Sequence, residues 1–136
     1  ILIDPIVTPI KGEINQVIAC LDFTAMLPDL APGCKSNIGL SNVSNGAPAH
    51  LRNYLNQTYL LMLQKYGLYA AIVDSYDKEM MALCRGEKPE LAAFVARLMD
   101  GESIDPAGLS EVQLRHMKTF NVLTGKSLFS DSWLEV

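Results

Sequence analysis

The stretch Ile38-Gly39-Leu40-Ser41-Asn42-Val43-Ser44 carries the fold prediction, because in it an apolar run passes into small polar residues. Asn45-Gly46-Ala47-Pro48 follows and opens a long segment with helical spacing of its apolar residues. This order predicts a β-strand that ends in a loop and continues into a helix. In α/β proteins ligands bind at such loops, because backbone N–H groups and the last side chains of the strand point into a crevice there.

Two more apolar runs have the same layout, so the sequence predicts three βα units. The predicted strands cover residues 1–3, 37–40 and 69–73. Each strand ends at polar residues, which are Asp4, Ser41 with Asn42, and Asp74. The strand ends recur about every 35 residues, the length of one βα unit, and right-handed crossovers make such strands parallel neighbours. The first strand is wholly apolar and is expected to be buried, as in a parallel sheet.

The spacing of apolar residues also predicts five helices. The first is expected over residues 13–27, where Pro28 ends it. The second begins near Pro48, buries a single apolar stripe and ends at Gly67 in a left-handed cap. The last three are expected at residues 78–84, 89–99 and 110–124, the final one opened by a capping box of Ser110 and Gln113.

Three further features complete the expected fold. Asp77 stands where the cap of the 78–84 helix is expected. Residues 87–113 are interpreted as a helical insertion before the last helix. The apolar tail residues Leu128, Phe129, Trp133 and Leu134 are expected to pack back on the body of the domain.

Composition excludes several classes of protein. A chain of 136 residues with net charge −4 and no basic stripe predicts one domain without a nucleic-acid partner. No apolar run approaches the roughly 20 residues of a membrane span. The cysteines are three in number, with no C-x-x-C pair, which favours reduced thiols and a cytoplasmic location over disulfides or a zinc site. Because residue 1 lies in the middle of a predicted strand, the chain is interpreted as the C-terminal part of a larger protein.

The polar residues at the strand ends have two interpretations each. Asp4 fits either a turn cap or an anionic acceptor for a paired N–H edge in a ligand. Asn42 is either a common loop residue or a group that both donates to and accepts from a ligand nitrogen. His50 and His116 form no metal-binding pair, and they are interpreted as surface or helix-packing residues. Ser41 and Ser44 lack the G-x-S-x-G pattern of a hydrolase, and no glycine-rich nucleotide-binding motif occurs.

Residues 39–44, the Asn56-Gln57-Thr58-Tyr59-Leu60 segment and residues 67–74 resemble the last part of the pterin-binding methyltransferase family. This family includes methyltetrahydrofolate:corrinoid/iron–sulfur protein methyltransferase and the folate domain of cobalamin-dependent methionine synthase. Its fold is a (β/α)₈ barrel, so the resemblance implies that this chain forms the sixth to eighth βα units with extra C-terminal helices. Ile3-Asp4-Pro5 and Asp131-Ser132-Trp133 resemble the preceding strand end and the final helix of the family.

The resemblance also implies roles for individual residues. Asp4 would hold the amino–pyrimidine edge of the pterin, Gly39 and Ser41 would line the pterin slot, and Asn42 would hydrogen-bond near the N5 nitrogen that carries the methyl group. The methyl group would pass from methyltetrahydrofolate to cob(I)alamin on a corrinoid partner protein. No metal is expected in this chain, since the cobalt belongs to the partner.

This sequence departs from the family pattern at one point near the site. The family commonly has an Arg shortly after the Asn, where this chain has His50 with Arg52 nearby, and a contact to the folate tail is therefore open. Asp74 is a further possible pocket residue.

Three alternatives stay open at this point. Dihydropteroate synthase shares the barrel and the pterin, but its Ser-Arg-Lys and His-Asp strand ends are replaced here by Ser41-Asn42-Val43 and Val73-Asp74-Ser75. The chain is otherwise a catalytically inactive pterin-binding homologue, or three units of a doubly wound, flavodoxin-like sheet. Three parallel strands cannot close a barrel, so the chain is expected to dimerise or assemble with further strands, and to be inactive alone.

Overall fold

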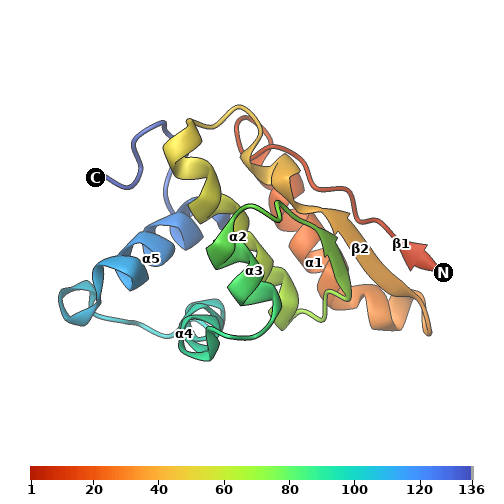
Figure 1. Ribbon diagram of the computed structural model, residues 1–136. Coiled ribbons are helices and arrows are strands. Elements are labelled where there is room, and N and C mark those ends of the chain that lie inside the picture. The colour runs from red at the N-terminus through yellow and green to blue at the C-terminus, as the bar shows by residue number, and fades with distance from the viewer. Residues whose placement is uncertain (136) are drawn as a thin grey trace.

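A computed structural model describes residues 1–135 and shows a parallel sheet packed against a layer of helices (Figure 1). The first half of the chain contains β1 (Leu2–Ile3), α1 (Ile14–Leu30), β2 (Lys35–Gly39), the 3₁₀ helix η1 (Leu40–Ser44), α2 (Ala49–Lys65) and β3 (Ala70–Ile72). The second half contains α3 (Lys78–Cys84), α4 (Pro89–Met99), the 3₁₀ helix η2 (Pro106–Gly108) and α5 (Glu111–Leu123). The strands lie in the order β1-β2-β3 and both pairs are parallel, which confirms the prediction of three parallel strands.

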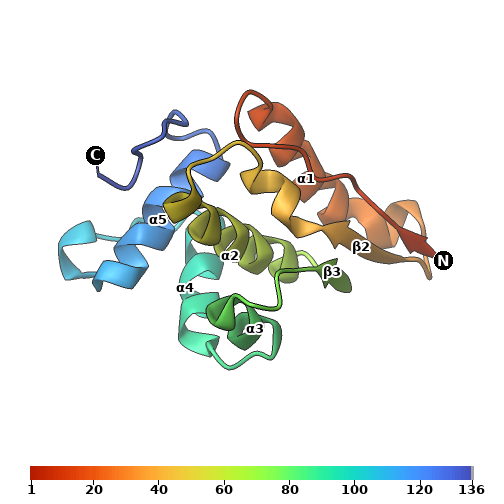
Figure 2. The ribbon, with the colours of Figure 1, turned by 45° about the horizontal axis from the view of Figure 1, so that its top comes forward.

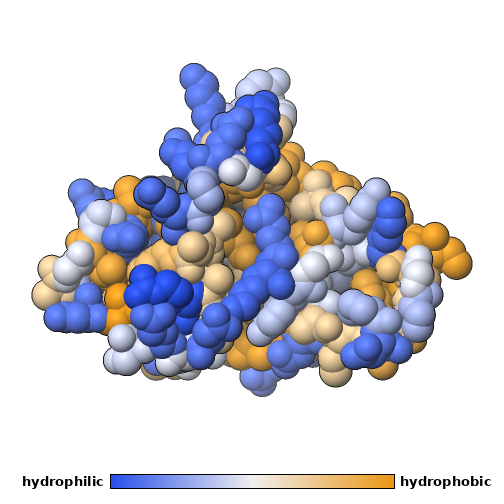
Figure 3. Space-filling view, turned by 90° about the horizontal axis from the view of Figure 1, so that it is seen from below, coloured by the Kyte–Doolittle hydropathy of each residue, from blue (hydrophilic) through white to orange (hydrophobic). Residues whose placement is uncertain are grey.

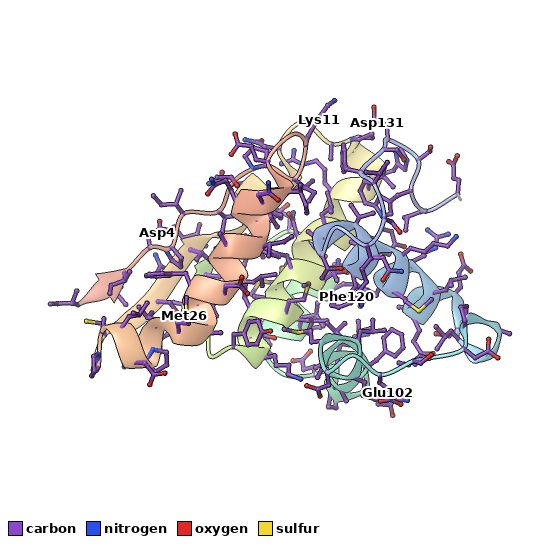
Figure 4. All side chains as sticks on the ribbon, turned by 180° about the vertical axis from the view of Figure 1, so that it is seen from behind. Asp4, Lys11, Met26, Glu102, Phe120 and Asp131 are labelled. Carbon is purple, nitrogen blue, oxygen red and sulfur yellow. The ribbon has the colours of Figure 1, made fainter. Side chains whose placement is uncertain are left out.

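The two helices that connect the strands lie on the same face of the sheet. Figure 1 shows the opposite face, with the strands in front, whereas α1 and α2 lie in front of the strands in the reverse view of Figure 4. The pleat of β2 follows this arrangement, because Ser36 and Ile38 are buried and Lys35 is exposed. In a doubly wound sheet helices cover both faces, but the described residues cover only one.

The other side of the sheet is called here the uncovered sheet face. It is defined by alternate residues of the three strands, which the pairing register brings level: Leu2, Lys35, Asn37, Gly39, Ala70 and Ile72. Ile72 is 68% exposed, and Leu2 is 59% exposed. The prediction that residues 1–3 are buried is therefore wrong for the first two of them, since nothing in the described chain packs over that edge of the sheet.

Helix α2 lies at the centre of the molecule (Figure 2). It contacts η1, α1, α3, α4 and α5, and every residue from 55 to 63 is buried. The predicted single apolar stripe is therefore too narrow, because neighbouring helices cover the sides of α2 that amphipathic spacing assigns to solvent. Gly67 ends this region at φ 86° with the Leu68 N–H donating to the Leu63 carbonyl, as the left-handed cap requires.

Helix α1 continues through Pro28, which corrects the predicted end of this helix. Pro28 lies in the last turn, so its missing N–H removes a single hydrogen bond, to the Thr24 carbonyl, before the helix ends at Leu30. In the first turn of α1 the Tyr59 hydroxyl of α2 donates to the Val17 carbonyl at 2.9 Å. Both side chains are fully buried there.

The C-terminal helices complete the core on the far side of α2. Within the predicted insertion 87–113, α4 buries Phe94, Val95 and Leu98 and packs on α2 and α5, so this region is part of the core. The structure confirms the capping box of Ser110 and Gln113 and the cap by Asp77, whose carboxylate accepts from the Met80 N–H at 3.0 Å. No helix of residues 1–135 is both long enough and apolar enough to cross a membrane.

His116 packs between α2 and α5, as the helix-packing interpretation of this residue predicts. Its Nδ1 atom lies 2.8 Å from the Thr58 hydroxyl, and the Tyr54 ring meets it edge-on. Burial lowers the pKa of His116 to about 4. His116 is therefore neutral in the folded protein at neutral pH.

This burial predicts a pH-dependent free energy of unfolding. An unfolded His has a pKa of about 6.5, so between about pH 6.5 and pH 4 the unfolded chain binds a proton that the folded chain excludes. The free energy of unfolding is therefore highest above pH 6.5, and it falls by about 3 kcal/mol as the pH drops to 4. Urea unfolding across this range is expected to show that loss, and His116→Gln is expected to remove it. The exposed His50→Gln control should keep it, and equal pH profiles for the two variants would contradict the prediction.

Candidate functional site

The carboxyl ends of the three strands meet at the upper edge of the sheet in Figure 1. Here β2 passes directly into η1, which carries Ser41 and Asn42. A strand therefore lies where 37–40 was predicted, but β2 begins earlier, at Lys35, and ends at Gly39. Leu40 already belongs to the 3₁₀ helix. A hydrogen bond from the Ile10 N–H to the Val43 carbonyl, 2.9 Å long, fixes η1 to the loop that follows β1.

Asn42 folds back over Gly39, the last residue of β2. Its Nδ2 atom lies 3.4 Å from the position that a Cβ atom on Gly39 would take, which is a close van der Waals distance. The absence of a side chain at Gly39 therefore leaves the space in which the Asn42 amide lies.

Asp4 follows β1 and is exposed (Figure 4). Its Oδ1 atom accepts a hydrogen bond from the Ile6 N–H at 2.8 Å, in a turn where Ile6 has a positive φ of 58°. Asp4 thus makes the turn contact of the first interpretation, and within residues 1–135 its Oδ2 atom makes no hydrogen bond. One carboxylate oxygen shapes the loop, and the other is available to a ligand.

Asp74 lies two residues beyond β3 and makes a similar turn. Its Oδ1 atom accepts from the Tyr76 N–H at 2.9 Å, and the side chain is exposed. The next acidic residue, Asp77, is held on both sides, because besides capping α3 it accepts from the Gln57 amide at 3.0 Å. Asp77 is therefore a structural link between α2 and α3.

Arg52, in the first turn of α2, is hydrogen-bonded to η1. Its Nε atom donates to the Ser44 hydroxyl at 3.2 Å, and that hydroxyl donates to the Ser41 carbonyl at 3.1 Å. This chain of two hydrogen bonds connects the first turns of α2 to η1. His50, by contrast, is exposed and lines a cavity with residues of α5, so the structure does not bring it to Asn42.

Two polar residues have positions that the sequence did not single out. Asn37 lies on the uncovered sheet face, opposite Ala70 and one register step beyond the pair formed by Ile3 and Ser36, which places it level with Asp4. The alternation of side chains along β2 is the signal that could have found it. Asn56 of α2 is 9% exposed, and its Oδ1 atom has no hydrogen-bond partner within the described residues.

The chemistry of the remaining titratable groups gives no second centre. Among residues 1–135 no three His, Cys, Asp or Glu side chains lie close enough together to hold a metal ion. All three cysteines are free thiols, and burial raises the pKa of Cys20 and of Cys84. Both thiols are therefore protonated at neutral pH and are poor nucleophiles.

Comparison with known proteins leaves the site to be interpreted from its own geometry. No protein-family model matches the sequence, and no solved structure matches the fold.

The Ser44 hydroxyl is expected to stabilise the candidate site. Ser44→Ala removes a buried group that both accepts from Arg52 and donates to Ser41, so it should lower the free energy of unfolding by about 1–2 kcal/mol. Ser41→Ala is the matched control, because only the backbone carbonyl of Ser41 takes part and its side chain is exposed. Urea unfolding of both variants measures the difference, and equal losses would contradict the assigned contact.

Proposed function

We propose that this chain is the pterin-binding end of a methyltetrahydrofolate-dependent corrinoid methyltransferase. In this proposal the chain supplies three consecutive βα units of a (β/α)₈ barrel, and the methyl group on the N5 nitrogen of the folate passes to cob(I)alamin on a corrinoid protein. The single observation that carries the proposal is the position of the Asn42 amide over Gly39 at the carboxyl end of β2.

The arrangement of the strands supports the barrel. Consecutive parallel strands with the connecting helices on one face are the repeating unit of a barrel, in which that face points outward. The opposite face then points into the barrel interior, and here it is the uncovered sheet face. The catalytic residues of such barrels lie at the carboxyl ends of the strands, which is where Asp4, Asn42 and Asp74 are found.

The donor and acceptor groups at this edge suit a pterin. The free carboxylate oxygen of Asp4 can accept from the amino group and ring N–H of a pyrimidine edge. Asn37, level with Asp4 on the same face, adds an amide that can donate or accept. Gly39 leaves room for a flat ring to approach the backbone, and Asn42 stands at the rim of that space.

Asn42 is assigned the catalytic contact. An N5 amine is a poor leaving group unless it is protonated, so transfer of the methyl group requires stabilisation of the protonated N5. The Asn42 side chain can turn its carbonyl oxygen toward that proton, a contact that strengthens only as the charge develops. Asn42 is exposed and its side chain makes no hydrogen bond within the described residues, so its amide has room to reorient.

Methyl transfer by the natural gene product that contains this sequence tests the assignment. Isothermal titration with methyltetrahydrofolate measures binding, and the absorbance of free cob(I)alamin follows the transfer. Asn42→Ala is expected to bind folate within a few-fold of the wild type and to transfer the methyl group about 10²–10³-fold more slowly. Asn45→Ala is the matched control, since Asn45 is the next exposed Asn of the same loop and is expected to change neither quantity.

The other results of this experiment separate the alternatives. Release of pyrophosphate with a dihydropterin substrate would identify a dihydropteroate synthase. Binding of folate by the wild type without any transfer would identify an inactive pterin-binding homologue. A wild-type protein that binds no folate would overturn the proposal and leave only a likeness of fold.

The barrel interpretation also predicts association through the sheet. β1 and β3 each have one edge without a neighbouring strand in the described chain, and exposed apolar side chains accompany both edges. Figure 3 shows a group of hydrophobic atoms at its right-hand edge, the end of the molecule that holds β1. Completion of the sheet, by a second copy or by further strands, would cover these groups.

Association of the isolated chain is therefore expected, and Ile72→Lys should weaken it. A charge on the uncovered sheet face opposes burial of that face, so sedimentation velocity should show a shift toward the monomer. Met26→Lys is the control, because Met26 is also an exposed apolar residue, 50% accessible, but lies on α1, which packs on the covered face of the sheet (Figure 4). A wild-type chain that stays monomeric at all concentrations would remove the support for this interface.

A further inference from the structure

The chain ends in a segment without helix or strand, residues 126–135, which is called here the strap. It leaves the end of α5, turns near Asp131 and runs back beside the first turn of α2 (Figure 4). Trp133 is the buried residue of this segment, with 5% of its side chain exposed. Phe129, Trp133 and Leu134 pack on the core, which confirms the prediction for these three residues, whereas Leu128 is 91% exposed and corrects it.

Besides the packing of Phe129, Trp133 and Leu134 on the core, the strap is joined to the body by a few hydrogen bonds, all to α5. The Trp133 indole N–H donates to the Thr119 hydroxyl at 3.2 Å, and the Lys118 ammonium donates to the Leu134 carbonyl at 3.0 Å. The only backbone hydrogen bond from the strap to α5 in the described residues runs from the Ser127 N–H to the Asn121 carbonyl, at 3.0 Å. The remaining hydrogen bonds of the strap are internal.

The space beneath the strap is incompletely filled. One cavity of about 330 Å³ lies between Leu134, Glu135, α5 and the first turn of α2, where His50 lines it. A second cavity of about 520 Å³ lies between the strap from Ser127 to Trp133 and the Asn121 side of α5. Lys118 lines both cavities, so it lies between them where the strap crosses α5.

We propose that the strap is a lid that opens as a unit while the rest of the fold stays intact, with Trp133 as its plug and the hydrogen bond from Lys118 to Leu134 as its latch. A terminal segment without helix or strand, joined to the body by few hydrogen bonds, opens at a lower free energy than the core, which is the general basis of local unfolding. When Trp133 moves away from α5, the Thr119 hydroxyl becomes exposed and the two cavities join along α5.

The opened groove combines leucine side chains with charged groups of both signs, because Glu111, Arg115, Lys118 and Glu135 also line it. Leu51 and Leu114 line it from α2 and α5, and Lys118 loses its carbonyl partner when the latch breaks. The groove also reaches the first turn of α2, two residues before Arg52, which holds η1 through Ser44. The lid and the candidate site therefore lie against the same end of α2.

The sole tryptophan of the chain provides a direct test. In a urea titration of the full chain, fluorescence of Trp133 reports the strap, and far-UV circular dichroism reports the helices. We expect the fluorescence to shift to the red at lower urea than the loss of helix, with a shallower slope because less surface is exposed. Lys118→Met should move the fluorescence transition to lower urea and leave the helical transition in place. Lys78→Met, which changes an exposed lysine at the start of α3, should move neither.

Each of the other results overturns the lid. Coincident fluorescence and helical transitions in the wild type and in Lys118→Met would show that the strap unfolds only with the core. A Lys118→Met variant in which both transitions move together would show that Lys118 stabilises the whole domain, without any latch function. A strap already open in the absence of urea, seen as quenching of Trp133 by acrylamide as in the unfolded chain, would exclude the closed state.

Discussion

The burial of α2 on every side is the constraint on which the rest of this structure depends. This helix connects β2 to β3, so its position fixes the sheet on one flank, and its other sides support α3, α4 and α5. Polar residues within it are accordingly paired across helices, Thr58 with His116 and Gln57 with Asp77. Such partners matter because an unpaired polar group in the core costs the energy of its lost hydration, and within the described part of α2 the Asn56 Oδ1 atom is the exception that lacks one.

The sheet has the opposite character, because one of its faces has no packing partner in the described chain. Helices cover the side that carries Ser36 and Ile38, and the alternating side chains of the same strands remain open. Open edges and apolar side chains on one small sheet are features that proteins normally cover by pairing or packing. The same face carries Asn37 and Gly39 toward the carboxyl ends of the strands, so the surface that needs completion and the surface proposed to bind a pterin are one.

The sequence predicts only part of the candidate site, because some of its contacts join near neighbours and others depend on how distant segments pack. The loop after β2 was predicted from its own residues, since a strand, a small polar turn and a helix follow one another locally. The contact of Asn42 with Gly39 is also local, spanning three positions. The link from Arg52 to Ser44, the removal of His50 to the α5 side and the alignment of Asn37 with Asp4 depend on how α2 and β1 are packed, and no short-range pattern contains that information.

By itself the sequence determined the features that arise from interactions between near neighbours. The capping box of Ser110 and Gln113, the cap by Asp77 and the left-handed turn at Gly67 are all closed within a few residues, and periodicity was enough to place the helices and the parallel strands. Only the tertiary structure decided which surfaces are covered. It buried α2 on all sides, left Leu2 and Ile72 exposed, carried α1 past Pro28 and laid Trp133 on Thr119, because burial depends on what other segments bring into contact and a hydrophobic pattern records only which residues favour it.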